Sequence, residues 1–296
     1  PRIDLRLGER VVDPVSLRGD FDAVLVTVGT HQGIVLPMKG HGLKNVYVNT
    51  AFLKAAREGK PLPVEEGRVV VLGGGNVAYD CARTAVRLGA KSVDVACLEA
   101  EDRMTSTPEE RKEAAEEGIV LHDAHAFNSI DESPEKPGFV GGMTIQKISR
   151  FYFDENHRAV TELVEGSELT LPADYVIFAV GQKSEDTPVM GLALTHGPYV
   201  VADGCLMTSV EGVFSAGDDV TGTKSVIAAI AQGREAASSI DRFLGGDGDI
   251  SEELLDREEG EQRIGKAAPG FYDSPVLPQF VPASERKGAL EPFECP

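Results

Sequence analysis

The stretch that decides the fold covers residues 68–80 and reads R-V-V-V-L-G-G-G-N-V-A-Y-D. Its apolar run, residues 69–72, lacks polar alternation, which is typical of a central parallel strand buried on both faces. Three glycines follow. Over residues 76–88 apolar or small side chains then recur at the spacing of one helix face. The sequence therefore predicts a strand, a glycine turn and a helix in direct succession.

The turn fits the pattern G-x-G-x-x-A, in which each small residue has a physical reason. Gly73 allows a tight turn, Gly75 lets backbone N–H groups reach a diphosphate, and Ala78 permits close packing of helix on strand. An anion is stabilised at the N-terminus of the helix. With a second strand at 92–98, the unit is predicted to bind a dinucleotide rather than to be a plain structural turn. The predicted contact residues are Gly73, Gly74, Gly75, Asn76, Val77 and Ala78.

Glu99 stands at the end of the predicted second strand, about twenty residues after the turn, where the acidic ribose-binding residue of such units is expected. A carboxylate there accepts hydrogen bonds from the adenosine ribose and repels the 2′-phosphate of NADP. This favours NAD(H). A solvated surface glutamate is the alternative reading, because Glu101 and Asp102 follow almost at once.

Other buried strands and helices are predicted around this unit. Short apolar strands end in glycine at three places: 22–28 before Gly29, 175–180 before Gly181, and 213–216 before Gly217. Helices are expected at 50–58, at about 107–117 with a cap and proline start, and at 225–243. Alternating polar and apolar residues between 119 and 171 predict a small antiparallel sheet.

Several motifs together resemble one family. They are V-V-V-L-G-G-G-N-V-A-Y-D-C-A-R from Val69, P-E-E-R-K-E-A-A-E-E-G-I from Pro108, A-V-G-Q from Ala179, and G-V-F-S-A-G-D from Gly212 with T-K-S-V-I-A-A-I-A-Q-G-R-E-A-A from Thr223. Over about residues 20–245 the chain resembles the glutamate synthase small subunit family of flavoprotein oxidoreductases. The resemblance implies hydride transfer between a nicotinamide and FAD, with electrons passed on to iron-sulfur clusters.

The resemblance also implies roles for particular residues. Asp218 would accept a hydrogen bond from the ribityl chain of FAD, with Gly217 allowing close approach. The helix start at Ser225 and Val226 would present N–H groups to the flavin, and Gly29, Thr30 and Gly181 would mark the crossings between the FAD and NAD domains. The arginine pair that holds the NADP phosphate in the family corresponds here to Leu98 and Glu99, which supports NAD(H).

The predicted fold is α/β: a Rossmann-type NAD-binding domain, with a parallel sheet and a small antiparallel sheet, inserted in an incomplete FAD-binding domain. The expected parts are 1–40 and 174–245 for the FAD domain, 41–173 for the NAD(H) domain, and 246–296 for a C-terminal tail. The family's first G-x-G-x-x-G and its cysteine-rich segment would precede Pro1 and do not occur in this sequence. Another segment or polypeptide is therefore expected to supply that half of the FAD site and the iron-sulfur partner.

The composition of the chain excludes some classes of binding partner. A formal net charge of -19 repels nucleic acid and anionic membranes, and no apolar run is long enough to cross a bilayer. Cys81, Cys97, Cys205 and Cys295 are far apart, which favours reduced thiols and a cytoplasmic location. His122 and His125 are three residues apart without a third ligand nearby, so a structural role is expected rather than a metal site.

These observations predict an enzyme, a pyridine nucleotide-dependent flavin oxidoreductase module, in which the cofactors carry the chemistry and no protein side chain acts as a nucleophile. The first alternative is a non-catalytic NAD(H)-binding or scaffolding module of a larger redox complex, which the missing FAD motif motivates. The second is a disulfide reductase of related fold, which the lack of a C-x-x-C pair disfavours.

Overall fold

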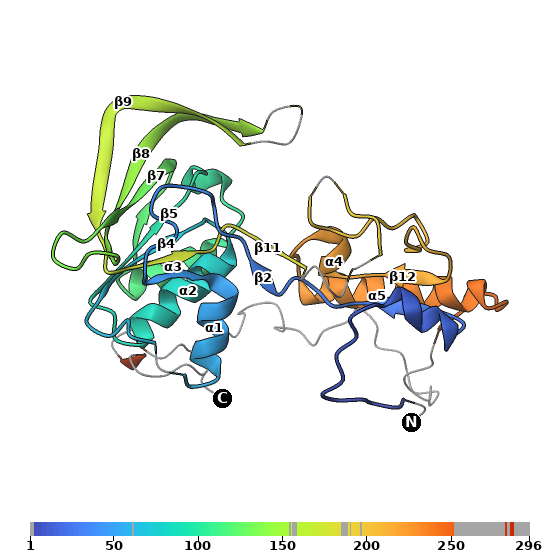
Figure 1. The fold of residues 1–296 in the computed structure, drawn as a ribbon. Coiled ribbons are helices and arrows are strands. Elements are labelled where there is room, and N and C mark those ends of the chain that lie inside the picture. Colours follow the sequence, from blue (N-terminus) through green and yellow to red (C-terminus); the bar gives the residue numbers. More distant parts are fainter. Residues whose placement is uncertain are drawn as a thin grey trace, which may run out of the picture.

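The computed structural model describes residues 3–60, 62–153, 155, 159–184, 189, 191–195, 197–251, 282, 285 and 286. The chain forms two lobes, which Figure 1 shows side by side. Two short strands run between them, β2 (Gln32–Gly33) and β11 (Gln182–Lys183), and they pair antiparallel. The outward and return crossings of the chain therefore lie next to each other.

The larger lobe contains a five-stranded parallel sheet in the order β3-β10-β4-β5-β6. Its strands are β3 (Val46–Val48), β4 (Arg68–Leu72), β5 (Ser92–Ala96), β6 (Val120–His122) and β10 (Tyr175–Phe178), and its helices are α1 (Asn49–Arg57), α2 (Asn76–Arg87) and α3 (Pro108–Glu116). The predicted helices and the parallel sheet are confirmed. The strand β3 was not predicted.

The run of apolar residues in β4 is explained by the layers on its two faces. Val69 and Val71 pack in a core with side chains of the three helices, whereas Val70 and Leu72 pack in a second core with the antiparallel sheet. All four residues are 0% exposed. A strand covered on both faces has no polar face, so the interpretation of this stretch as a central strand is confirmed.

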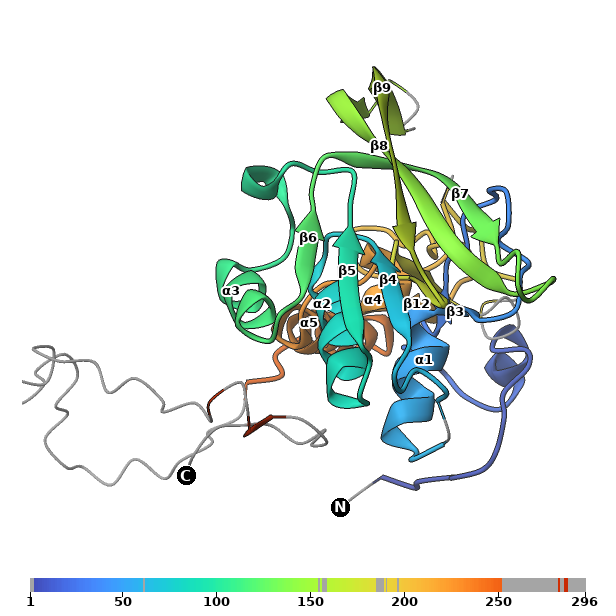
Figure 2. The same ribbon diagram turned by 90° about the vertical axis from the view of Figure 1, so that its left-hand side faces the viewer.

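The second layer is the predicted antiparallel sheet, β7 (His125–Glu132), β8 (Val140–Phe153) and β9 (Ala159–Pro172), in the order β7-β8-β9. Figure 2 shows it crossing the side of the parallel sheet that faces away from α1 and α2. Ile130, Met143 and Ile145 bury their side chains against the parallel sheet. The lobe is therefore a sandwich of helices, parallel sheet and antiparallel sheet.

One predicted boundary is wrong. Ending the NAD(H) domain at residue 173 assigned the strand at 175–180 to the FAD part. In the structure β10 lies between β3 and β4 in the parallel sheet of the larger lobe, with Ile177 opposite both Tyr47 and Val71. The chain therefore leaves this lobe only after β10, at Gly181, because without β10 the strands β3 and β4 would have no partner between them.

The smaller lobe has a two-stranded parallel sheet, β1 (Val24–Val26) with β12 (Val213–Ser215), and two helices, α4 (Asp218–Thr221) and α5 (Val226–Phe243). A single-turn helix, η1 (Val15–Gly19), precedes β1, and a second, η2 (Glu101–Arg103), lies in the larger lobe. The start of α5 leaves apolar side chains uncovered: Val226, Ile227 and Ile230 are 76%, 79% and 60% exposed.

The expected C-terminal tail lies mostly outside the described residues. Arg286 is described, and its guanidinium is buried beside Glu117 at the end of α3, with Nη1 3.3 Å from Oε1. None of the helices in the described ranges combines the length and apolarity needed to cross a bilayer.

Candidate functional site

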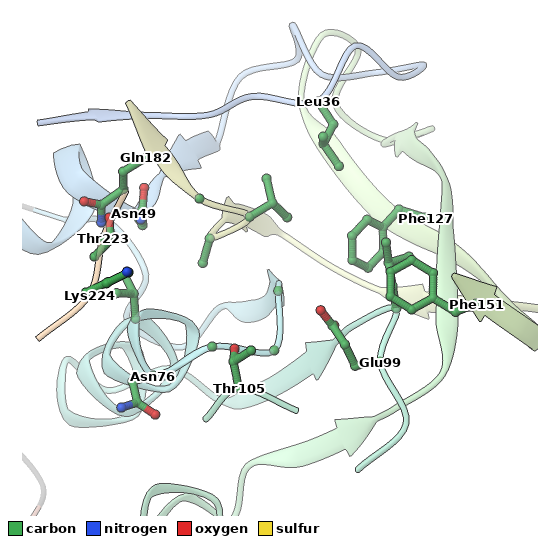
Figure 3. Close-up of a pocket in the computed structure, with 18 residues that line it drawn as sticks. Leu36, Asn49, Asn76, Glu99, Thr105, Phe127, Phe151, Gln182, Thr223 and Lys224 are labelled. Carbon is green, nitrogen blue, oxygen red and sulfur yellow. The ribbon is translucent and has the colours of Figure 1, made fainter. Parts of the chain in front are cut away.

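The order of the strands predicts where a ligand binds in the larger lobe. From β4 the chain continues to β5 and β6 on one side, while β10 returns on the other side, so the connections diverge at the carboxyl end of β4. Ligands of open parallel sheets bind at such a switch point. A cavity of about 630 Å³ opens there (Figure 3). It is lined by Leu36, Asn49, Gly73, Gly74, Gly75, Asn76, Val77, Leu98, Glu99, Thr105, Phe127, Phe151, Ala179, Val180, Gly181, Gln182, Thr223 and Lys224.

The glycine turn forms the floor of this cavity. Gly73 has a φ of 134°, and a Cβ there would overlap the carbonyl oxygen of Ala179 on the neighbouring strand. A Cβ at Gly74 would come within 3.0 Å of Cys97 Cβ and 3.2 Å of Glu99 Oε2. Side chains at these positions would therefore displace the strand end or the carboxylate beside the turn. The backbone of the turn stays bare toward the cavity.

The N-terminus of α2 opens into the same cavity. Its N-cap is Gly75, which supplies no side-chain hydrogen bond, so no side chain occupies the position of an anion there. Asn76 Oδ1 accepts a hydrogen bond from Thr107 N at 2.9 Å, so this side chain does not occupy the anion position either. A Cβ at Gly75 would meet only Thr105 Oγ1, at 3.5 Å. Free N–H groups of a helix start, at the positive end of its dipole, suit a diphosphate.

Glu99 is held at one end of the cavity by its backbone. Its carbonyl oxygen accepts from Ala124 N at 2.9 Å, and Cys97, two residues earlier, exchanges backbone hydrogen bonds with the following strands. Ala124 has a positive φ of 48° in the turn that makes this contact. The carboxylate itself lies beside Gly74. The backbone of Glu99 is therefore fixed, and its acidic group lies next to the glycine turn.

The two ends of the cavity differ in chemistry, as Figure 3 shows. Around Glu99 the wall is apolar, with Leu98, Phe127 and Phe151. The other end carries polar groups from both lobes: Asn49, Gln182, Thr223 and Lys224. Of the residues described around the cavity, Lys224 alone is basic, and it lies at the end remote from Glu99. Among the described lining residues, the Glu99 end therefore carries no basic side chain.

The residues predicted for the nucleotide gather at this site, with one difference. Gly73, Gly74, Gly75, Asn76, Val77, Glu99 and Gly181 line the cavity. Ala78 lies beneath it, fully buried in the helix-side core. Sequence reasoning missed Asn49, Gln182 and Thr223 as lining residues. Asn49 directly follows β3, which was not predicted. Gln182 and Thr223 stand next to predicted turns, so their positions could have been predicted from the sequence.

The residues predicted for FAD lie in the smaller lobe, outside the cavity lining. Thr30 lies next to the cavity, since its Oγ1 is 3.1 Å from Oγ1 of the lining residue Thr223. Gly29 has a φ of 65° and Gly217 a φ of 93°. Asp218 Oδ1 accepts from Lys224 N at 3.3 Å, and Ser225 Oγ caps α5 by accepting from Ala228 N at 3.2 Å. Val226 is exposed on that helix.

Asp219, which was not predicted, is the buried acid of the smaller lobe. It is 0% exposed, its Oδ2 accepts from Ser215 Oγ at 2.8 Å, and its Oδ1 has no hydrogen-bond partner among the described residues. Burial raises the pKa of this carboxyl to about 6. A buried carboxyl is costly to ionise. Because its Oδ1 has no partner among the described residues, Asp219 is a buried polar group that the packing of the smaller lobe does not fully satisfy.

The cysteines and histidines have structural surroundings. Cys81 and Cys97 are buried free thiols, and Cys205 is an exposed one; Cys295 lies outside the described residues. Burial raises the pKa of Cys97 to about 12, far from a reactive thiolate. His122 Nε2 lies 2.8 Å from Asp94 Oδ1, and the rings of His122 and His125 meet edge to face with centroids 6.1 Å apart.

Residues 8–233 match the family described as pyridine nucleotide-disulphide oxidoreductase, and the chain belongs to this family. Within it, the predicted resemblance to glutamate synthase small subunits is confirmed. The chain is 34% identical over 264 residues to the "Glutamate synthase [NADPH] small chain" of Escherichia coli, covering 82% of this chain and 55% of the relative. It is 35% identical over 250 residues to the "NADP(+)-dependent formate dehydrogenase subunit beta" of Moorella thermoacetica, covering 82% of this chain and 35% of the relative. The chain thus spans between about a third and just over half of these relatives.

Solved structures show the same fold. Mycobacterium tuberculosis FprA in complex with NADPH superposes with a TM-score of 0.66 at 17% identity, covering 79% of this chain and 66% of that one. Thioredoxin reductase of T. acidophilum superposes with a TM-score of 0.55 at 23% identity, covering 74% and 64%. The predicted fold class, α/β with a parallel sheet and a small antiparallel sheet, is confirmed.

Proposed function

We propose that the chain is the nicotinamide-binding part of a flavin-dependent oxidoreductase that transfers hydride between NAD(H) and FAD, with electrons passed on to an iron-sulfur partner. The observation that carries this proposal is one cavity at the switch point that combines a bare glycine turn, a helix start without a side-chain cap and a carboxylate beside the turn. The turn and α2 bind the diphosphate, and Glu99 binds the adenosine ribose.

The preference for NAD(H) over NADP(H) follows from charge at the Glu99 end. The carboxylate accepts hydrogen bonds from two ribose hydroxyls but repels a 2′-phosphate. Leu98 beside it is apolar, and the cavity's basic residue, Lys224, lies at the other end. The named relatives are NADPH or NADP(+) enzymes, so this chain is proposed to differ from them at this position.

The smaller lobe fits a bound FAD. Gly217 has the positive φ that leaves its Cα open to close approach, and the apolar start of α5 is exposed, as a face covered by an isoalloxazine ring and further protein would be. FAD, when bound, supplies the acceptor for the hydride and releases the two electrons singly. Thr30 Oγ1 lies 3.1 Å from Thr223 Oγ1, and Thr223 lines the cavity, so these two residues of the smaller lobe stand where the nicotinamide and flavin would meet.

The completing half of the FAD site and the iron-sulfur group are proposed to belong to other protein segments. The exposed Val226, Ile227 and Ile230 support a partner over α5. The proposal that an iron-sulfur group accepts the electrons is based on the family resemblance. Buried, protonated thiols at Cys81 and Cys97 support a reducing compartment, for which we propose the cytoplasm, and do not support disulfide reduction.

The substitution Glu99→Arg tests the proposal. Losing the charge-assisted hydrogen bonds is expected to weaken NADH binding about 10- to 100-fold, while NADPH binding tightens. Fluorescence titration of the full chain with each nucleotide measures both effects. Glu101→Arg, the same charge change outside the cavity lining, is the matched control and is expected to leave the preference unchanged. Tighter binding of NADPH than NADH by the unmodified chain would contradict the proposed specificity.

A further inference from the structure

Asn49 is a buried polar side chain that the fold itself does not use. It is the first residue of α1, directly after β3, and it is 1% exposed. Its Oδ1 is buried and has no hydrogen-bond partner within the described part of the chain. A buried oxygen left without a donor destabilises the fold, because it has lost its hydrogen bonds to water without replacement. Such a group, placed on the wall of a cavity, indicates that a ligand supplies the missing donor.

The surroundings of Asn49 hold its amide at the cavity. The crossing strand β2 lies against it, because Gly33 N donates to Thr50 Oγ1 at 3.1 Å. A Cβ at Gly33 would overlap Asn49 Oδ1, so the glycine makes room for this amide. Asn49 also gives no capping hydrogen bond to α1, whose N-cap is Val48. Packing therefore fixes the side chain without satisfying it.

Position along the cavity decides which ligand group meets Asn49. Figure 3 shows Glu99 at one end and Asn49 with Gln182, Thr223 and Lys224 at the other end. The glycine turn also lines the cavity. A dinucleotide is a linear molecule of adenosine, diphosphate and nicotinamide riboside. With the adenosine at Glu99 and the diphosphate at the turn, as the proposed function requires, the nicotinamide lies at the Asn49 end.

We propose that Asn49 recognises the carboxamide of the nicotinamide ring, with its Oδ1 accepting an N–H of that group. The carboxamide supplies the only N–H donors on the ring, and an amide oxygen is a matching acceptor. Gln182, at the same end, is a second amide that is available to the carboxamide oxygen. Asn49 is thus a positioning residue that fixes the rotation of the ring without touching the transferred hydride.

The test uses three ligands and the full chain. NADH contains the carboxamide, reduced 3-acetylpyridine adenine dinucleotide keeps the carbonyl but has a methyl group in place of the NH₂, and ADP-ribose lacks the ring. The unmodified chain is expected to bind NADH about three- to tenfold more tightly than the acetylpyridine analogue, as for one neutral hydrogen bond. Asn49→Leu is expected to abolish this discrimination and to leave the ADP-ribose affinity unchanged.

Controls separate recognition from folding. Leucine is close to asparagine in size and removes an unsatisfied acceptor, so the unfolding midpoint of Asn49→Leu is expected to stay at or above that of the unmodified chain. Asn49→Ser serves as a second variant with the same expected loss of discrimination. Asn128→Leu is the matched control, because Asn128 donates to Gln146 on the antiparallel sheet, outside the cavity lining.

The outcomes distinguish the two proposals. Discrimination that survives in both Asn49 variants, or an equal loss of NADH and ADP-ribose binding, overturns the role of Asn49 alone. An unmodified chain that binds neither ADP-ribose nor NADH overturns the proposed function and this inference together. Equal affinity for NADH and its acetylpyridine analogue in the unmodified chain overturns the inference while leaving the nucleotide site in place.

Discussion

The two lobes contain the same local arrangement, a buried strand, a glycine turn and a helix, with different results. In the larger lobe, β4 leads through Gly73 to α2, and the turn lies against the carbonyl of Ala179, directly after β10. In the smaller lobe, β12 leads through Gly217 to α4, and a Cβ at Gly217 would meet only Asp219 Oδ1, at 3.8 Å.

The difference comes from the number of layers around each turn. Five strands with helices on one face and a second sheet on the other enclose the first turn, while two strands and α5 support the second. The larger lobe therefore supplies most of the cavity wall, which Thr223 and Lys224 of the smaller lobe complete. The smaller lobe presents exposed apolar side chains on α5 and the unsatisfied carboxyl of Asp219. The same short motif becomes a closed site only where neighbouring strands complete it.

Alanine at the two glycines provides the sharpest test of this comparison. Gly73→Ala combines an unfavourable φ with overlap of the Ala179 carbonyl, and is expected to cost about 4 kcal/mol or more of unfolding free energy. Gly217→Ala carries the backbone strain alone, about 2 kcal/mol. Urea unfolding measures both. Equal costs would show that the packing of β10 on the first turn is unimportant.

Truncation of one isoleucine in each lobe compares their packing. Ile177, in β10, is 0% exposed, so Ile177→Ala is expected to lose about 3 kcal/mol through lost burial and a cavity. Ile227, on α5, is 79% exposed, so Ile227→Ala is expected to change stability by less than about 0.5 kcal/mol. Thermal or urea unfolding of the chain alone gives the result. A large loss at Ile227 would mean that this face is already covered.

The pH dependence of stability sharpens the comparison at Asp219. Its folded pKa of about 6 lies above the usual value of 3.8, so the folded state holds a proton that the unfolded state has released at intermediate pH. Stability from this group is full below the unfolded pKa and falls as pH rises through 6. Relative to Asp219→Asn, the unmodified chain is expected to lose about 2 kcal/mol between pH 4 and pH 7.

Urea unfolding of both chains across that range measures the difference. Ser215→Ala, which removes the one side-chain donor to Asp219, is expected to enlarge the loss. A difference between the chain and its asparagine variant that does not vary with pH would show that the carboxyl is ionised throughout.

The larger lobe was the more predictable, because its signals are local. The apolar run of β4, the glycines after it and the capped start of α3 at Thr107 each act within a few residues of the chain. The same holds for the place of Glu99 at the end of the second strand. Such positions can be predicted from spacing, since a βαβ unit fixes the distance from turn to ribose site.

The sequence by itself determined the glycine turn, the position of the acidic residue after the second strand and the class of fold, since these depend on short-range periodicity and backbone freedom. Only the tertiary structure placed β10 between β3 and β4 and Asn49 at the far end of the cavity. Both depend on pairing between segments more than a hundred residues apart in the chain, as when Val48 meets Phe178. The spacing of residues along the chain does not predict such contacts, because they depend on which faces of the sheets and helices are buried against each other in the folded protein.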